Sequence, residues 1–133
     1  LIISSINNRS LLIILTIIAT LQAKHLHKEK YYQKIFCQKF DGVLEYVLDD
    51  KTRVDCLTSN YAVEVDFAEK WGESVGQSLY YAIKTNKKAG VLLIMEDKRK
   101  SIKYLKRLKT VAKKHAIAIW TIDKDNTIAQ IIF

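Results

Sequence analysis

The stretch from residue 53 to residue 67 constrains the fold more than any other part of the chain. It contains two runs in which apolar and polar residues alternate, RVDCLT (53–58) and YAVEVDF (61–67), separated by Ser59-Asn60. Alternation with a period of two is typical of strands that have one buried face and one polar face. Because only two polar residues separate the runs, the pattern predicts an antiparallel β-hairpin.

The hairpin brings three carboxylates onto one face. A two-residue loop places Asp55 directly opposite Glu64, and it places Arg53 opposite Asp66. Asp66 lies two residues beyond Glu64, so strand periodicity gives both side chains the same face. The other face receives an apolar set made of Val54, Cys56, Val63, Val65 and Phe67.

Such crowding of negative charge predicts a metal site. Like charges directly opposed across two strands destabilise a sheet, and a divalent cation removes the repulsion. A set of oxygen ligands favours a hard ion, so we expect Asp55, Glu64 and Asp66 to hold Mg²⁺ or Mn²⁺. The alternative is a solvent-facing acidic strand face that Arg53 and nearby lysines neutralise.

Periodicity along the rest of the chain predicts an α/β fold. The expected order is helix, three-strand meander, helix, strand, helix, strand: 24–39, then 43–48, 53–58 and 61–67, then 68–84, 90–95, 98–115 and 116–122, with 127–133 as an edge strand or a tail. The buried stripes expected for the later helices are Trp71, Val75, Leu79, Ala82 and Ile83, and Ile102, Leu105, Leu108 and Ala112. We therefore expect one domain over 24–133, with a mixed central sheet of the meander plus two further strands and helices on both faces.

These residues resemble the core of PD-(D/E)xK nucleases. In that superfamily an acid on one strand is followed by Glu-x-Lys on the next, and here Asp55 is followed by Glu64-Val65-Asp66. The stretch Gln77-Ser78-Leu79-Tyr80-Tyr81 resembles the Q-x-x-x-Y motif of RecB-like nucleases, and Glu29 falls where Holliday-junction-resolvase-like members carry a further acid. The D-C-L-T and E-x-D-F-A-x-K-W stretches also resemble those of small exported bacterial proteins of unknown role.

The resemblance implies a restriction-endonuclease-like core and metal-dependent cleavage of phosphodiesters. It also implies catalytic roles for Gln77 and Tyr81, on the helix that follows the active-site strand. One position departs from the motif, because Asp66 stands where the family has lysine. Some members with an acid there are active and others only bind. Lys70, one turn into the next helix, is our first candidate for the missing positive charge, with Arg53 and Lys51 as alternatives.

The charge of the chain indicates a polyanionic partner. The net charge is +8, and the segment 98–115 has nine Lys or Arg residues and no acid. We expect this basic helix to bind nucleic acid through phosphate contacts, with little sequence preference. A solvated helix face is the alternative. The residues expected to make the contacts are Lys103, Lys106, Arg107 and Lys113.

The first 23 residues have the layout of a signal peptide. Arg9 precedes the apolar run 11–19, which is short for a bilayer span, and the small residue Ala23 follows. We expect export to the periplasm or the medium, with an uncleaved membrane anchor or a buried helix as alternatives. His25 and His27 are then expected to be solvated, near the cleavage point. In an oxidising compartment Cys37 and Cys56 can form a disulfide, whereas in the cytosol they would be core thiols.

The sequence therefore supports a leading hypothesis and two rivals. The first is an exported Mg²⁺- or Mn²⁺-dependent nuclease with Asp55, Glu64, Asp66, Lys70, Gln77 and Tyr81 in its site and no organic cofactor. The second is an inactive module of the same fold that binds nucleic acid or an envelope partner. The third is a structural periplasmic domain whose acids only form salt bridges.

Overall fold

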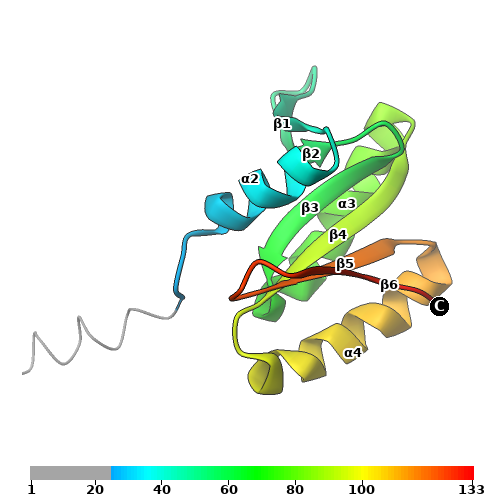
Figure 1. Ribbon diagram of the computed structural model, residues 1–133. Coiled ribbons are helices and arrows are strands. Elements are labelled where there is room, and N and C mark those ends of the chain that lie inside the picture. Colours follow the sequence, from blue (N-terminus) through cyan, green and yellow to red (C-terminus); the bar gives the residue numbers. More distant parts are fainter. Residues whose placement is uncertain (1–24) are drawn as a thin grey trace, which may run out of the picture.

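The computed structural model describes residues 25–133, so the expected signal peptide lies outside the described residues. Six strands form one mixed sheet in the order β1-β2-β3-β4-β5-β6 (Figure 1). β1 to β3 are antiparallel, β3 to β5 are parallel, and β6 is antiparallel to β5. The strands are β1 (Val43–Val47), β2 (Arg53–Leu57), β3 (Tyr61–Phe67), β4 (Lys88–Met95), β5 (Ala118–Asp123) and β6 (Ile128–Ile131).

Helices cover both faces of this sheet, which confirms the expected α/β class. α2 (Glu29–Lys39) lies on one face, and α3 (Trp71–Thr85) and α4 (Lys98–His115) lie on the other (Figure 1). A short 3-10 helix, η2 (Ala68–Lys70), joins β3 to α3. The segment 127–133, expected to be an edge strand or a tail, contains the edge strand β6, which pairs with β5.

Two apolar layers hold the helices to the sheet. Tyr32 and Phe36 of α2 pack on Val63 and Val65 of β3, and all four side chains are fully buried. The opposite layer joins β4 and β5 to α3 and α4; its buried members include Val91, Leu93, Leu105, Leu108 and Ile119. β4 and β5 are central strands with both faces covered, which is why their sequences are continuously apolar.

Two helix positions were predicted wrongly. Ile83 is 81% exposed and Ile102 is 44% exposed, although both were expected in buried stripes. In α3 the side chains buried on the sheet include Ser74 and Ser78, and in α4 Ser101 is buried in place of Ile102. Small hydroxyl side chains can lie where a helix closely approaches a sheet, so the contacting stripe is shifted from the most apolar one.

The predicted hairpin register is confirmed near the loop. Thr58 N–H donates to the carbonyl of Tyr61 at 2.9 Å, and Cys56 pairs with Val63. Two side chains depart from the expected faces. Arg53 forms an ion pair with Glu45 at 3.1 Å instead of facing Asp66. Val54 was expected beside Cys56, but it packs with Ala62 and Tyr81 on the α3 side.

The departure has a local cause in the two strands at the edge of the sheet. β1 and β2 pair on both sides of Glu45 and Asp55 but not at these two residues. Glu45 has a φ of 50°, which is outside the extended region, so the strand pair is distorted there. Side-chain alternation along β2 is therefore broken at Asp55, and Val54 turns toward α3.

A disulfide joins α2 to β2. Cys37 and Cys56 are bonded, and the two Cα atoms are 5.6 Å apart. Both half-cystines are buried in the layer under α2. Gly42 lies against this bond, because a Cβ at that position would be 2.4 Å from Cys56 Sγ and 2.7 Å from Cys37 Sγ. The close packing explains why glycine precedes β1.

We expect loss of this disulfide to lower the free energy of unfolding by about 3 kcal/mol, because a cross-link over 19 residues restricts the unfolded chain. The double variant Cys37→Ala/Cys56→Ala, unfolded in urea, measures the effect. Reduced wild type serves as the control and should match the variant. A difference below about 1 kcal/mol would show that the bond contributes little.

Candidate functional site

Asp55 replaces part of the ladder between β2 and β3. Pairing of the two strands stops at Cys56 and Val63, and beyond it Asp55 Oδ2 accepts the backbone N–H of Val65 at 2.8 Å. The carbonyl of Asp55 accepts instead from Gln33 Nε2 of α2, also at 2.8 Å. Since buried backbone groups need partners, these two bonds stabilise the separation of the strands. The Asp55 carboxylate is thereby fixed beside the middle of β3.

Four carboxylates form what we call the carboxylate cluster: Glu29, Asp55, Glu64 and Asp66. Glu64 and Asp66 are 4% and 6% exposed, so this part of β3 carries two buried acids. Glu29, at the start of α2, is joined to Asp66 through Lys70, whose Nζ is 3.7 Å from Glu29 Oε2 and 3.8 Å from Asp66 Oδ1. The structure thus places the predicted residues Asp55, Glu64, Asp66 and Lys70 around one site.

Ser74 supports the cluster and was missed by the sequence analysis. Its Oγ donates to Asp66 Oδ2 at 2.7 Å, and the side chain is fully buried. Ser74 is in the first turn of α3, in a stripe with Ser78 and Tyr81. The helical spacing of these polar residues could have indicated that Ser74 faces the sheet. The apolar stripe beside them has the clearer periodicity and was chosen as the buried face.

Burial raises the pKa of every carboxyl group in the cluster. Burial and then the negative charge of Asp55 raise the pKa of Glu64 to about 9. Burial and then the charge of Asp66 raise the pKa of Glu29 to about 7. Burial raises the pKa of Asp55 to about 6, although the hydrogen bond from Val65 lowers it, and burial also raises the pKa of Asp66. Without a cation, Glu64 therefore holds a proton at neutral pH.

Glu64 also carries the unexplained polar atom of the site. Its Oε1 is buried and has no hydrogen-bond partner among the described residues. A buried oxygen without a partner is unfavourable by about 1–3 kcal/mol, and such atoms in native structures often mark an ion or a water. Within residues 25–133 no three His, Cys, Asp or Glu side chains stand in a ready metal-ligand arrangement. The donor set of carboxylate oxygens nevertheless fits Mg²⁺ or Mn²⁺.

The two residues of the Q-x-x-x-Y motif lie differently. Tyr81 is buried, and burial followed by the charge of Glu64 raises its pKa, so its ring lies near the cluster. Gln77 is exposed on α3, one turn before Tyr81. Only Tyr81 of this pair thus contributes to the buried surroundings of Glu64.

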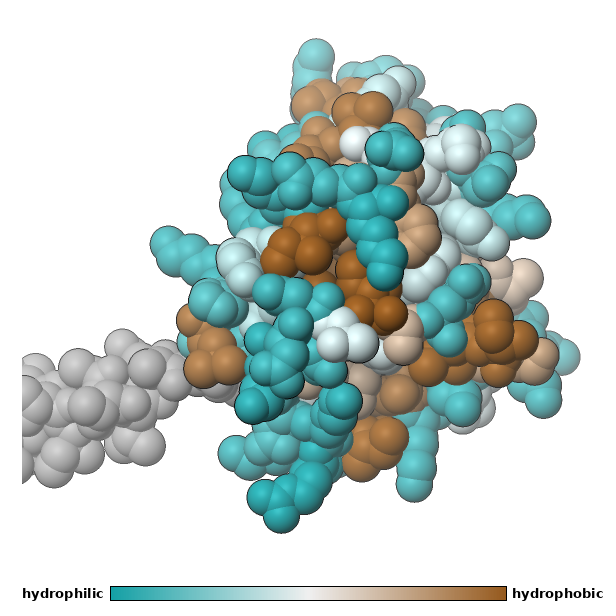
Figure 2. Space-filling view, viewed as in Figure 1, coloured by the Kyte–Doolittle hydropathy of each residue, from teal (hydrophilic) through white to brown (hydrophobic). Residues whose placement is uncertain are grey.

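The basic helix is exposed as predicted. Hydrophilic side chains project from the lower part of the molecule in Figure 2, where α4 lies in Figure 1. Its inner side is anchored by Leu105 and Leu108. The predicted phosphate-contacting residues are all exposed: Lys103, Lys106, Arg107 and Lys113. A brown patch near the end of β6 marks apolar surface, where Ile132 and Phe133 are exposed.

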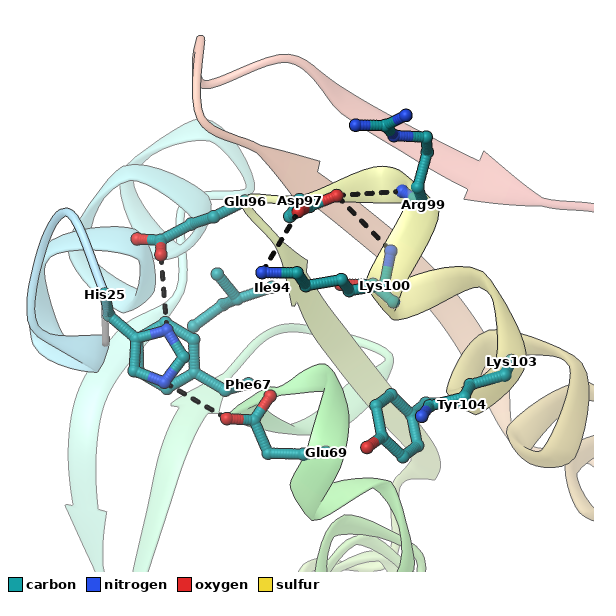
Figure 3. A pocket seen from close by; sticks show the side chains of 11 residues that line it. His25, Phe67, Glu69, Ile94, Glu96, Asp97, Arg99, Lys100, Lys103 and Tyr104 are labelled. Carbon is teal, nitrogen blue, oxygen red and sulfur yellow. Dashed lines mark hydrogen bonds and ion pairs between the residues drawn. The ribbon is translucent and has the colours of Figure 1, made fainter. Parts of the chain in front are cut away.

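A cavity opens at the carboxyl ends of β3 and β4 (Figure 3). Its volume is about 360 Å³, and it lies between the start of α4 and the segment before α2. His25 lines it and is not a solvated residue, contrary to the prediction. His25 Nε2 is 3.1 Å from Glu69 and its Nδ1 is 3.2 Å from Glu96, while its ring stacks on Phe67.

Comparisons with models of protein families, with curated proteins and with solved structures found no match for this chain. Over the part of the chain that the structure describes, no helix has the length and apolar composition needed to cross a bilayer.

The raised pKa values predict that stability falls with rising pH. Between pH 4.5, the ordinary value for Glu64, and about pH 9, the folded chain keeps a proton that the unfolded chain releases. The stabilisation is complete below that window and is lost as pH rises through it, by at most about 1.4 kcal/mol per pH unit for one proton. We expect Glu64→Gln to flatten the dependence, as glutamine binds no proton.

Urea unfolding from pH 5 to pH 9 in the presence of a chelator measures this. Asp125→Asn is the control, since it removes an exposed carboxylate and should keep the wild-type slope. A wild-type stability that is flat or rises over this range would contradict the assignment. So would equal slopes in wild type and Glu64→Gln.

Proposed function

We propose that this chain is a Mg²⁺- or Mn²⁺-dependent nuclease with a restriction-endonuclease-like core, and that it cleaves phosphodiester bonds of nucleic acid outside the cytoplasm. The observation that carries the proposal is the buried Glu64 oxygen without a partner, next to Asp55 and Asp66. A cation at this place would supply a partner for the Glu64 oxygen and would remove the repulsion among the acids. The exposed lysines and arginines of α4 supply the attraction for a polyanion.

The residues of the site fit distinct parts of this chemistry. Asp55, Glu64 and Asp66 would hold the metal, which activates water and stabilises charge on the phosphate. Ser74 positions Asp66 through its hydrogen bond. Lys70 contacts Asp66, the position at which the resembled superfamily has lysine, so its ammonium group would steady the phosphate after leaving Glu29.

A second candidate is supported by the same carboxyl group. A Glu64 that holds a proton at neutral pH needs no cation to neutralise it. The fold would then be an inactive module that binds nucleic acid or an envelope partner, with Asp66 as the lost lysine position. The two candidates differ in whether a metal replaces the proton on Glu64.

Magnesium should stabilise the wild type, because only the folded chain offers the site. At a Mg²⁺ concentration of ten times the dissociation constant, the free energy of unfolding should rise by about 1.4 kcal/mol, and the melting temperature by roughly 4 °C. The shift should grow from pH 6 to pH 8, since metal binding must release the Glu64 proton. Melting curves with and without Mg²⁺, together with cleavage of plasmid and single-stranded DNA and RNA, measure both effects.

The matched variants separate the two candidates. Glu64→Gln should lose both the stabilisation and the cleavage, and Asp125→Asn should retain both. If wild type shows neither effect but binds nucleic acid, the inactive module is the correct description. Stabilisation that persists in Glu64→Gln would place the metal elsewhere.

Lys70 offers an independent test of the catalytic role. Its ion pairs are long and its side chain is 49% exposed, so Lys70→Gln should change stability by less than about 1 kcal/mol. We expect cleavage to fall by at least about tenfold, because charge next to the scissile phosphate is lost. Lys84→Gln, which breaks the ion pair between Lys84 of α3 and Asp49, is the control. Equal activity in the two variants would remove Lys70 from the mechanism.

We further propose that the chain is exported to the periplasm or secreted, with membrane anchoring as the alternative. The buried Cys37–Cys56 bond supports this, because such bonds persist in oxidising compartments. N-terminal sequencing of protein isolated from cells should find a mature chain that begins within a few residues of Lys24. An intact N-terminus on cytoplasmic protein would contradict export.

A further inference from the structure

The cavity at the carboxyl ends of β3 and β4 lies beside the carboxylate cluster. Phe67 and Glu69 line the cavity, whereas their chain neighbour Asp66 belongs to the cluster and Lys70 forms an ion pair with it. The strands β3, β4 and β5 are parallel, and ligands of open α/β sheets bind outside the carboxyl ends of such strands. The volume of about 360 Å³ is in the range of small-molecule sites.

The acids that line the cavity already have partners. Glu69 binds His25 Nε2, and Glu96 binds His25 Nδ1 and accepts from the Tyr32 hydroxyl at 2.7 Å. Asp97 accepts from two backbone N–H groups at the start of α4. These carboxylates therefore connect the elements around the cavity, and their negative charge is largely balanced by these partners.

The lysines of the cavity have weaker interactions with their neighbours. Lys100 Nζ is 3.7 Å from Asp97 Oδ2, but both side chains are exposed, so this ion pair is weak. Lys103 Nζ lies 4.9 Å from the centre of the Tyr104 ring. Figure 3 shows Lys100 reaching from α4 toward Asp97 and Lys103 beside Tyr104. The positive charge of this side is therefore available to an anion.

Flat rings form two walls of the same cavity. His25 stacks on Phe67 with ring centres 3.5 Å apart and an angle of 11° between the rings. Tyr104 stands on the other side, at the first turns of α4 (Figure 3). Aromatic rings beside lysines are the combination that binds single-stranded nucleic acid, since bases stack on the rings and phosphates meet the charge.

We propose that this cavity binds one nucleotide of the substrate, with its base between the His25–Phe67 stack and Tyr104 and its phosphate on Lys100 and Lys103. The inference rests on the proposed nuclease function in one respect, namely that the bound unit is the neighbour of the scissile phosphate. A base that stacks on protein side chains must be unpaired. The proposed site therefore implies a substrate that is single-stranded or frayed at its end.

Adenosine 5′-monophosphate is the probe for this site. Titrated into the full chain with a chelator present, it should shift the backbone amide NMR signals of Phe67, Lys100, Lys103 and Tyr104. Adenosine and inorganic phosphate should each bind at least about tenfold more weakly, as each lacks one half of the contacts. Tyr104→Leu and Lys103→Gln should each weaken binding about fivefold or more.

Lys109→Gln is the matched control, because it removes an exposed lysine of α4 that does not line the cavity. It should leave the affinity within about twofold, since only general attraction changes. No shift at the cavity amides, or equal weakening in Lys109→Gln and Lys103→Gln, would overturn the inference.

Failure of this inference is distinguishable from failure of the proposed function. Glu64→Gln should bind the nucleotide as wild type does, because the cavity does not use the cluster. Nucleotide binding without any metal-dependent cleavage would reject the nuclease and keep the cavity. Metal-dependent cleavage without nucleotide binding would reject the cavity site and keep the nuclease.

Discussion

The hydrogen bond from Val65 N–H to the Asp55 carboxylate is the interaction on which the site depends. It takes the place of a ladder bond, so β2 can leave β3 while the backbone of β3 stays satisfied. Gln33 of α2 completes the arrangement by donating to the Asp55 carbonyl. The opening lets Glu29 of α2 approach Asp66 of β3, with Lys70 between them. A continuous ladder would have kept α2 and the acids of β3 apart.

The separated strands leave the molecule with buried carboxyl groups that are close to one another. Burial penalises their charged forms, and mutual repulsion adds to the penalty. The fold has two ways to relieve this: Glu64 keeps a proton, or a cation takes the proton's place. An enzyme that uses the second way would be least stable at alkaline pH without metal and would regain stability when the metal binds. The same carboxyl groups thus couple the stability of the fold to pH.

The sequence predicted those parts of the fold that follow from local pattern. The alternating runs and the Ser59-Asn60 loop were enough for the hairpin register next to the loop, and the apolar runs were enough for β4 and β5. The buried stripe of α4 was predicted at Leu105 and Leu108 but not at Ile102. These predictions succeed because strand and helix periodicity directly reflect burial.

The parts that failed depend on how separate elements meet. Val54 changes face where Glu45 of β1 and Asp55 of β2 interrupt the pairing of the two strands. His25 is held by Glu96, 71 residues further along the chain, and no local pattern indicates that contact. The sequence predicted Asp55 directly opposite Glu64, but pairing of β2 with β3 ends before Asp55, and the pattern did not reveal that an oxygen of Glu64 lacks a partner. That fact emerges only when all surrounding elements are in place.

The most direct measurement is a crystal structure of the full chain soaked with Mn²⁺ at pH 8. The account predicts anomalous density within coordination distance of the Asp55 and Glu64 carboxylates, and loss of that density in Glu64→Gln crystals. Crystals in which Glu64 remains unliganded at saturating Mn²⁺, or in which Mn²⁺ binds only elsewhere, would contradict it.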